Sequence, residues 1–452
     1  MVIFKKILLG LVTLVISLIT IVLLINLSIF DEELDPEIQE LIKPKPLVLS
    51  PDNAYFAYMG ISASADKDMM ESGMAFVKRY AENRNNGIDD MLTQDYLETL
   101  GKRIPDTLGD NFEFCSVRKQ NDCVSKINKQ IADMPADDPL LLLQLQRYQT
   151  MIKLQKFEYP FQFSNMSLLP GYSPILKLNK IQISTISQQL NNSKIIKNLI
   201  ADIKFWRMAL DQDNLLIGKM IALEPLWTDL LFLSDFIDNH NLNQDDIKKI
   251  KSFLSPLSDS EKSFSQTVNA EFLYISHKMT DPDFNSFGSE GNNYSLLSIL
   301  CQPNATINAY YNSHILSLKN LSKLPFDEFL HYFRQCAYKQ TQKGDNCIPN
   351  NFEEPNYFKP SSYYNLTGKI MLFSALWFPE KHIARVHDLN TMIRLVNLQL
   401  SLKTVDKELI PQAIEDSEFN NPYTGKPMDY DAENGWLSFE CLDKHSVCRV
   451  QI

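Results

Sequence analysis

The sequence lacks the short motifs that mark the common catalytic sites. It has no HExxH, and no serine stands in GxSxG, since Ser289 in "FGSEG" has no upstream glycine to form a nucleophile elbow. A phosphate loop needs GxxxxGK[ST]. At Gly425-Lys426 no glycine stands five residues earlier, Pro427 replaces the Ser/Thr and no helical pattern follows. We therefore expect a turn at Gly425, no catalytic residue and no cofactor.

Histidines are also few, and their spacing does not suggest a metal site. His382 and His387 lie five positions apart, which is about 140° around a helix, so they cannot share a metal as an i, i+4 pair does. Cys301 and His314 offer the two residue types of a nucleophile and its base, but the sequence gives no geometry for such a pair. A solvated helix face is the simpler interpretation of "EKHIARVHD".

One acidic loop is a weak metal candidate. In "DPDFNSFGSEGNN", Asp281, Asp283 and Asn285 occupy positions 1, 3 and 5 of an EF-hand-like loop. Ser286 replaces the glycine of position 6, and Asn292 replaces the bidentate glutamate of position 12. We expect weak affinity at best, and an acidic solvent loop is the alternative.

Charged residues are missing from Ile7 to Phe30, "ILLGLVTLVISLITIVLLINLSIF". About 20 apolar residues cross a hydrocarbon core of about 30 Å, so this run predicts a transmembrane helix. A cleavable signal peptide is the alternative, but its apolar stretch spans only about 7–15 residues before a small-residue cleavage site. The exit "INLSIFDEELD" has no Ala-x-Ala, which favours a retained anchor.

The flanking charges predict the orientation of this anchor. Lys5 and Lys6 precede the span, and four acidic residues follow it between Asp31 and Asp35. Basic residues stay on the cytoplasmic side. We therefore predict a single-pass inner-membrane protein with a cytoplasmic N-terminus and a periplasmic ectodomain; in a eukaryote the outer compartment would be the lumen or the extracellular space.

The cysteines favour the same compartment. Thiols pair outside the cytosol, and six of the seven cysteines fall into three local pairs. A zinc site is the alternative, but the spacings are not CxxC and no histidine pair accompanies them. The predicted disulfides are Cys115–Cys123, Cys336–Cys347 and Cys441–Cys448, with Cys301 as a free thiol.

The formal net charge of −11 argues against a nucleic-acid partner, which needs a basic surface. Helical patterns fill most of the chain. Asp138-Pro139 and the capping box Ser258-x-x-Glu261 predict helix starts, and Pro225 predicts a kink or break in an apolar central helix. We predict a mainly α-helical bundle or irregular helical array with a small C-terminal β-hairpin.

These patterns suggest four segments. Residues 1–30 form a cytoplasmic tip and the anchor, and 31–52, with four prolines among charged residues, form a stiff stalk. Residues 53–415 form the helical ectodomain, and 416–452 form a hairpin closed by Cys441–Cys448.

The tail has a recognisable corner, "NPYTGKP", followed by a predicted hairpin. This pattern resembles the C-terminal end of many uncharacterised proteobacterial envelope proteins. The stretches "NLLIGKMIALEPLWTDL" and "CQPNATINAYYN" are similar to segments of one such membrane-anchored helical family. The resemblance implies a bacterial, periplasm-facing protein and no catalytic residue.

Three functions remain open on the sequence alone. The first is a membrane-tethered, non-catalytic interaction or structural protein of the bacterial envelope. The second is a periplasmic hydrolase of cell-wall or glycan material, which a cluster of carboxylates in a deep groove would favour. The third is an immunity-type binder of a toxin or secretion component. A large exposed apolar patch would favour the first or the third function.

Overall fold

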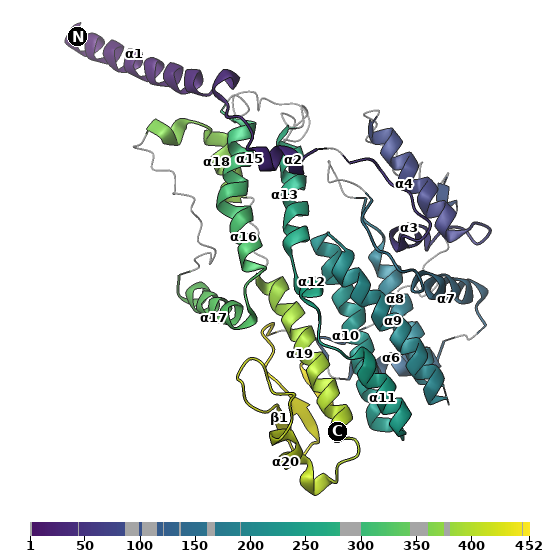
Figure 1. Ribbon diagram of the computed structural model, residues 1–452. Coiled ribbons are helices and arrows are strands. Elements are labelled where there is room, and N and C mark those ends of the chain that lie inside the picture. Colours follow the sequence, from purple (N-terminus) through teal and green to yellow (C-terminus); the bar gives the residue numbers. More distant parts are fainter. Residues whose placement is uncertain are drawn as a thin grey trace. The chain divides into compact units, whose positions relative to one another are not determined.

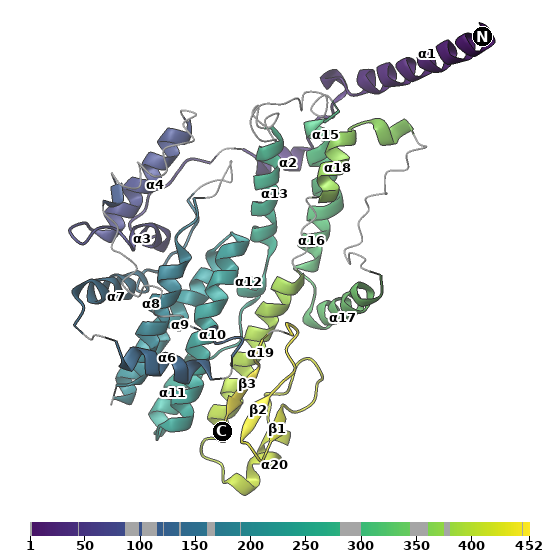
Figure 2. The same ribbon diagram turned by 180° about the vertical axis from the view of Figure 1, so that it is seen from behind.

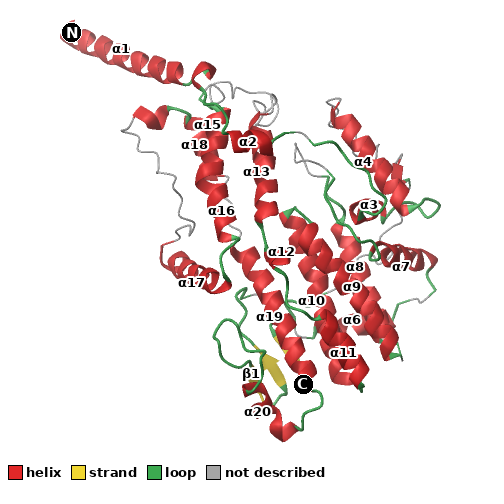
Figure 3. Cartoon of the chain, viewed as in Figure 1, coloured by secondary structure: helices red, strands yellow, loops and turns green. Residues whose placement is uncertain are grey.

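A computed structural model of the chain confirms the predicted fold class, mainly α-helical with a small β-sheet near the C-terminus (Figure 3). The structure describes residues 2–43, 45–85, 99–101, 115–120, 122–134, 137–160, 168–189, 191–280, 300–343, 360–374, 380–444 and 446–452. The chain divides into two compact units, each built from separate stretches of the sequence.

Unit 1 consists of Met1–Lys45, Phe161–Ser167 and Phe264–Pro379. Its elements are α1 (Val2–Ile25), η1 (Ser28–Phe30), α2 (Pro36–Leu41), α13 (Ser265–Thr280), α15 (Pro303–Tyr310), the π-helical turn η3 (Tyr311–Ile315), α16 (Leu316–Leu321), α17 (Phe326–Lys343), η4 (Pro360–Tyr363) and α18 (Leu366–Ser374).

Unit 2 consists of Pro46–Pro160, Leu168–Ser263 and Glu380–Ile452. Its helices are α3 (Ala54–Gly60), α4 (Met69–Asn85), α6 (Cys123–Ala132), α7 (Pro139–Met151), α8 (Tyr172–Ser187), α9 (Asn192–Gln212), α10 (Leu216–Asn239), α11 (Gln244–Phe253), α12 (Asp259–Lys262), α19 (Glu380–Leu402), η5 (Lys407–Leu409) and α20 (Ile410–Glu415). Its strands are β1 (Asp429–Asp431), β2 (Trp436–Ser438) and β3 (Arg449–Gln451).

Helix α10 lies at the centre of unit 2 and packs against α8, α9, α19 and β3 (Figure 1). Its sequence is apolar nearly all round, so it can be covered on every side. Trp227, Phe232 and Phe236 of α10 are almost fully buried, as is Trp206 of α9. Burial of aromatic and aliphatic side chains of this size is the main favourable term in folding.

The predicted helix starts are confirmed, and the predicted break in α10 does not divide the helix. The Asp138 carboxylate accepts hydrogen bonds from the backbone N–H groups of Leu140 and Leu141, with Pro139 in the first turn. The Ser258 capping box is present as well. Helix α10 continues through Pro225 as one element, because tertiary packing outweighs the loss of one backbone hydrogen bond.

Helix α1 of unit 1 has the length and composition of a membrane span. Residues Ile3–Ile25 have a mean hydropathy of 3.0, and none of this stretch is buried within the protein. An apolar helix that protein atoms leave uncovered fits a hydrocarbon environment. By length and composition alone, a signal sequence would fit the same description.

Residues 31–43 are the first part of the segment 31–52 that was predicted to be a stiff stalk, and they contact α15. Asp31 caps the N-terminus of α15, where its carboxylate accepts hydrogen bonds from the backbone N–H groups of Asn304 and Ala305, both at 3.0 Å. Asn308 of α15 donates to the Glu33 carbonyl at 2.8 Å, and its own side-chain oxygen accepts from the Asp35 N–H at 3.0 Å. The segment follows α15 because these polar groups satisfy one another.

The C-terminal sheet has three strands in the order β1-β2-β3, all antiparallel, and not the two strands of a simple hairpin (Figure 2). The predicted pair is present, with Tyr430 opposite Leu437, and β3 adds Val450 on the other side of Leu437. Strand β3 escaped prediction because no tight turn joins it to β2, whereas the turn between β1 and β2 marked those two strands as a hairpin.

The Gly425-Lys426 corner is a turn, as expected. The Gly425 φ angle is +68°, and its N–H donates to the Asn421 carbonyl at 2.9 Å. The Lys426 carbonyl in turn accepts from the Asn421 N–H at 2.8 Å, while the Lys426 side chain is exposed. The Asn421 and Thr424 side chains also accept hydrogen bonds from backbone N–H groups of this corner, so the Lys426 side chain is not needed to form it.

Gly425→Val is expected to lower the free energy of unfolding by about 1–3 kcal/mol, because a β-branched residue is strained at positive φ. Lys426→Ala serves as the control and is expected to cost less than about 0.5 kcal/mol, because its side chain is solvated. Thermal melts of both variants test this. Equal melting temperatures for Gly425→Val and the wild-type chain would contradict the argument.

Candidate functional site

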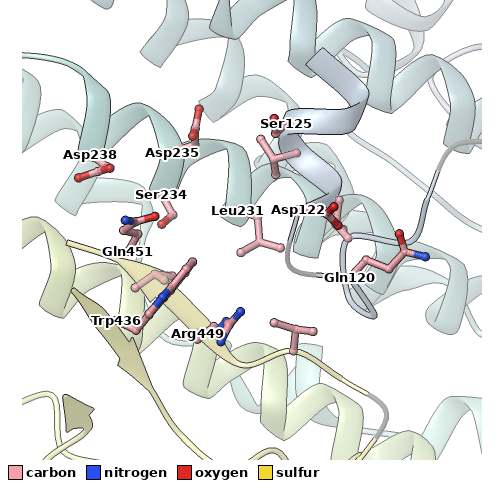
Figure 4. Close-up of a pocket in the computed structure, with 14 residues that line it drawn as sticks. Gln120, Asp122, Ser125, Leu231, Ser234, Asp235, Asp238, Trp436, Arg449 and Gln451 are labelled. Atoms are coloured by element: carbon pink, nitrogen blue, oxygen red, sulfur yellow. The ribbon is translucent and has the colours of Figure 1, made fainter. Parts of the chain in front are cut away.

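A pocket of about 200 Å³ opens on unit 2 where α6, α10 and the C-terminal sheet meet (Figure 4). One wall is the loop 117–122 with the start of α6, and a second is the exposed face of the C-terminal half of α10. The third wall is formed by β2, β3 and Val447, which lies two positions before β3. The lining residues are Val117, Gln120, Asp122, Val124, Ser125, Leu231, Ser234, Asp235, Asp238, Trp436, Val447, Arg449, Val450 and Gln451.

Two disulfide-closed loops build two of these walls. Cys115–Cys123 encloses the loop of the first wall, and Cys441–Cys448 encloses the connection between β2 and β3. The two loops also touch, because the Arg118 carbonyl accepts a hydrogen bond from the Val447 N–H at 2.6 Å. Residues far apart in sequence are therefore fixed at one pocket by local covalent closures.

An ionic network holds the two loops together. The Asp443 carboxylate lies 2.8 Å from the Arg118 guanidinium and 2.8 Å from that of Arg385 on α19. Glu224 of α10 lies 3.9 Å from Arg118 and 3.7 Å from Lys180. Burial lowers the pKa of Lys180, while the Glu224 carboxylate acts to raise it. Partly buried, multiply paired charges of this kind fix geometry better than isolated surface pairs do.

Helix α19 binds the C-terminal sheet and the tail through two buried polar side chains, Gln399 and Asp388. The Gln399 side-chain amide donates to the Gln451 carbonyl of β3 at 2.7 Å and to the Ser234 carbonyl of α10 at 2.9 Å. It thereby joins two walls of the pocket. Asp388 binds the tail near Cys441, accepting hydrogen bonds from the backbone N–H groups of Leu442 and Asp443, both at 2.9 Å.

The inner surface of the pocket combines acidic side chains with one stacked guanidinium. Arg449 lies over the Trp436 ring, 4.3 Å from its centroid, a cation–π contact. Among the described residues Arg449 makes no ion pair, and its buried Nε has no hydrogen-bond partner. Asp122, Asp235 and Asp238 outnumber this single positive charge.

The carboxylates of the pocket differ in their electrostatic state. The hydrogen bond from Lys126 lowers the pKa of Asp122, and the two groups lie 2.8 Å apart. Protein atoms around the Asp235 carboxyl displace water and raise its pKa, and the nearby Asp238 carboxylate adds to this rise. Asp235 also accepts a hydrogen bond from the Asn239 side chain at 3.1 Å. Because Asp122 is already paired with Lys126, Asp235 and Asp238 are the carboxyl groups of the pocket that could accept hydrogen bonds from a cation.

The residues singled out in the sequence lie elsewhere. The candidate metal ligands Asp281, Asp283 and Asn285 fall outside the described residues, as do Ser289 and Cys347, the predicted partner of Cys336. In the described part of the chain, no group of three or more His, Cys, Asp or Glu side chains could hold a metal ion.

The histidine and cysteine candidates lie in partly or fully buried positions. Burial lowers the pKa of both His382 and His387 to about 4, with Arg385 contributing at His382 and Lys262 at His387. His314 is fully buried and its ring stacks on Tyr310. Burial raises the pKa of the Cys301 thiol, which is the opposite of what activates a nucleophile.

The pocket was missed because its lining residues are spread over three distant stretches of sequence. The cysteine spacings were the one available signal, since they placed two short closed loops at 115–123 and 441–448. Nothing local in the sequence indicated that these loops meet.

Comparisons of this chain with models of protein families, with curated proteins and with solved structures find no match. The function of this chain is therefore inferred from its own contacts, distances, burial and charges.

Proposed function

We propose that this chain is a membrane-tethered, periplasm-facing, non-catalytic interaction protein of the bacterial envelope, and that the pocket of unit 2 receives part of its protein partner. The observation that carries the proposal is the construction of the pocket, whose walls include both disulfide-closed loops. Such a site is stable only where disulfides persist, which is outside the cytosol.

Contacts at the end of α1 support a retained anchor. Asn26, directly after α1, is almost fully buried, and its side chain donates to the Tyr363 carbonyl and accepts from the Asn365 N–H. Asp31 caps α15 as described above. Cleavage of α1 as a signal peptide near residue 30 would remove Asn26 and leave buried polar groups without partners, which is costly.

The size and charge of the pocket favour a basic side chain of a partner protein. A volume of about 200 Å³ is below the range of about 300–1,000 Å³ that is usual for small-molecule sites. It is enough for a lysine or arginine side chain. The excess of carboxylates provides the attraction, and Gln451 and Ser234 add polar groups at the wall.

We expect a photoreactive residue at position 120, in place of Gln120, to cross-link the full-length chain in cells to one discrete partner protein. Gln120 lines the pocket, whereas Lys129 lies further along α6, is exposed and does not line it. The same photoreactive residue at position 129 is the matched control and should give at least severalfold less of the product. A product of equal yield from both positions, or none from position 120, would contradict the proposal.

A periplasmic hydrolase of cell-wall or glycan material is the second candidate, because Asp235 has a raised pKa and stands near Asp238 in a pocket. To test this candidate, the purified chain is incubated with cell-wall material. Release of soluble sugars that is abolished in Asp235→Asn would favour the hydrolase. The identity of a cross-linked partner would separate a general envelope component from a toxin or secretion component, as an immunity-type binder requires.

A further inference from the structure

Two carboxylates lie fully buried in the helical core of unit 2, away from the pocket. Asp202 of α9 and Asp229 of α10 are both 0 % exposed, and Asn179 of α8, which lies between them, is 1 % exposed. The Asn179 side-chain N–H group donates to Asp202 Oδ1 at 3.2 Å and to Asp229 Oδ1 at 3.1 Å. One amide therefore joins the two carboxyl groups.

The other hydrogen bonds of this cluster leave three acceptors without a donor. The Tyr148 hydroxyl donates to Asp202 Oδ1 at 2.9 Å, and Trp206 Nε1 donates to the Tyr148 oxygen at 3.0 Å. Asn179 Oδ1, Asp202 Oδ2 and Asp229 Oδ2 are buried and have no hydrogen-bond partner in the described part of the chain. Buried oxygens in native proteins are almost always paired, so the cluster is short of donors.

The groups that face the pair carry no positive charge. Tyr148 comes from α7, Asn179 from α8 and Trp206 from α9, and Tyr58 of α3 is close enough to Asp202 for its own pKa to be raised by that charge. Among the residues that the structure describes, no basic side chain contributes to the pKa of either carboxyl.

Helices α6 and α19 also pack against α10, and three of their charged side chains are engaged elsewhere. Lys126 of α6 pairs with Asp122, and Arg385 and Asp388 of α19 bind the C-terminal tail.

We propose that the Asp202–Asp229 pair is a proton-binding site, with at least one of the two carboxyls neutral in the folded protein at neutral pH. A proton on Asp229 removes one buried charge and supplies a donor for one of the acceptors that lack a partner. Ca²⁺ or Mg²⁺ would need about six or more oxygen ligands or waters, and Zn²⁺ is usually held by four ligands that include Cys or His. The cluster offers three oxygens without a partner among the described residues, in a site that solvent does not reach.

The electrostatics of the pair agree with this assignment. Burial raises the pKa of Asp202 from 3.8 to about 7, and burial together with the Asp202 charge raises the pKa of Asp229. A carboxyl whose pKa is raised on folding holds its proton more tightly in the folded state. Its contribution to stability is therefore full in acid and is lost as pH rises from about 4 through the folded-state pKa.

The consequence is a helical core that is more stable in mildly acidic than in alkaline surroundings. Asn179, Asp202 and Asp229 join α8, α9 and α10, and Tyr148 adds α7, so a second negative charge would strain four helices at once. A compartment outside the inner membrane follows the pH of the medium more closely than the cytosol does. The pair would then act as a pH-sensitive element of the ectodomain.

Asp229→Asn tests the proposal, because asparagine is a neutral carboxamide of similar shape that donates hydrogen bonds. Denaturant unfolding of the detergent-solubilised full chain would be followed by tryptophan fluorescence from pH 5 to pH 7. We expect the folded-to-unfolded ratio of the wild type to fall about tenfold per pH unit more steeply than that of Asp229→Asn, the effect of one proton. The exposed Asp406→Asn is the matched control and should keep the wild-type slope.

Three results would overturn the proposal. The first is equal pH slopes for folded wild type and folded Asp229→Asn. The second is a stabilisation of the wild type, but not of the variant, by added Ca²⁺, Mg²⁺ or Zn²⁺, which would indicate a metal site. The third applies if Asp229→Asn does not fold. Asp202→Asn and the infrared carbonyl band of a protonated carboxyl in the wild type at pH 7 are then measured instead. Absence of that band, together with a wild-type pH slope of stability in Asp202→Asn, would overturn the proposal.

Discussion

Asp388→Ala is expected to detach the C-terminal tail from α19 and to lower the free energy of unfolding by about 3–5 kcal/mol. Asp388 is fully buried, and its carboxylate accepts hydrogen bonds from the Tyr423 hydroxyl at 2.7 Å and from the N–H groups of Leu442 and Asp443. Alanine would remove the acceptor that these three donors share, and each unsatisfied buried group costs about 1–3 kcal/mol. Denaturant unfolding measures the loss, and limited proteolysis should cut the tail first.

Asp388→Asn separates the hydrogen bonds from the charge. Asparagine keeps Oδ1, which accepts from Tyr423 and Leu442, but it places an NH₂ group against the Asp443 N–H. We expect a smaller loss, about 1–2 kcal/mol. Glu415→Ala, at an exposed position of α20, should cost less than about 0.5 kcal/mol. An Asp388→Ala variant as stable as Glu415→Ala would refute this role for Asp388.

Local features of the fold were predictable because they depend on neighbours in sequence. The helix starts at Asp138 and Ser258 need only a capping side chain and the next three residues. The turn at Gly425 likewise follows from a short run of turn residues. The apolar character of α10 predicted its central position, since a helix without a polar face must be covered all round.

Features made by distant residues were not predictable in this way. Prolines near residues 36–51 suggested a stalk, but Asp31 and Asp35 bind α15 some 270 positions later in the chain. The pocket is a comparable case, since it needs two disulfide-closed loops to meet. For the buried pair a signal did exist: Asp202 follows Leu199 by three positions and precedes Trp206 by four, so it belongs to the apolar face of α9.

The pocket and the buried pair place different demands on unit 2. The pocket depends on covalent closure at its rim, whereas the pair depends on the protonation of its core. Cys115–Cys123 and Asp202 are linked to the same central helix, because Arg118 pairs with Glu224 of α10 and Asn179 joins Asp202 to Asp229 of α10. Reduction of the disulfides should therefore change the pocket without removing the pH response of stability. Asp229→Asn should remove that pH response and leave the pocket unchanged.

Removal of both disulfides of unit 2, by alanine at Cys115, Cys123, Cys441 and Cys448, is expected to cost about 4–6 kcal/mol and to abolish the cross-link from position 120. The bonds close loops with sequence separations of 8 and 7. Each loop of this size contributes about 2–3 kcal/mol on the chain-entropy model. The cross-link should fail because both loops line the pocket and would no longer hold its walls.

The two single-disulfide variants complete a double-mutant cycle. Because Arg118 in the first loop binds Asp443 and Val447 in the second, we expect a coupling energy of about 0.5–3 kcal/mol between the two removals. Cys301→Ala is the control for loss of a thiol outside unit 2 and should leave the cross-link unchanged. Strictly additive losses, with a cross-link that survives in the quadruple variant, would mean that the loops do not act together and that the pocket does not depend on them.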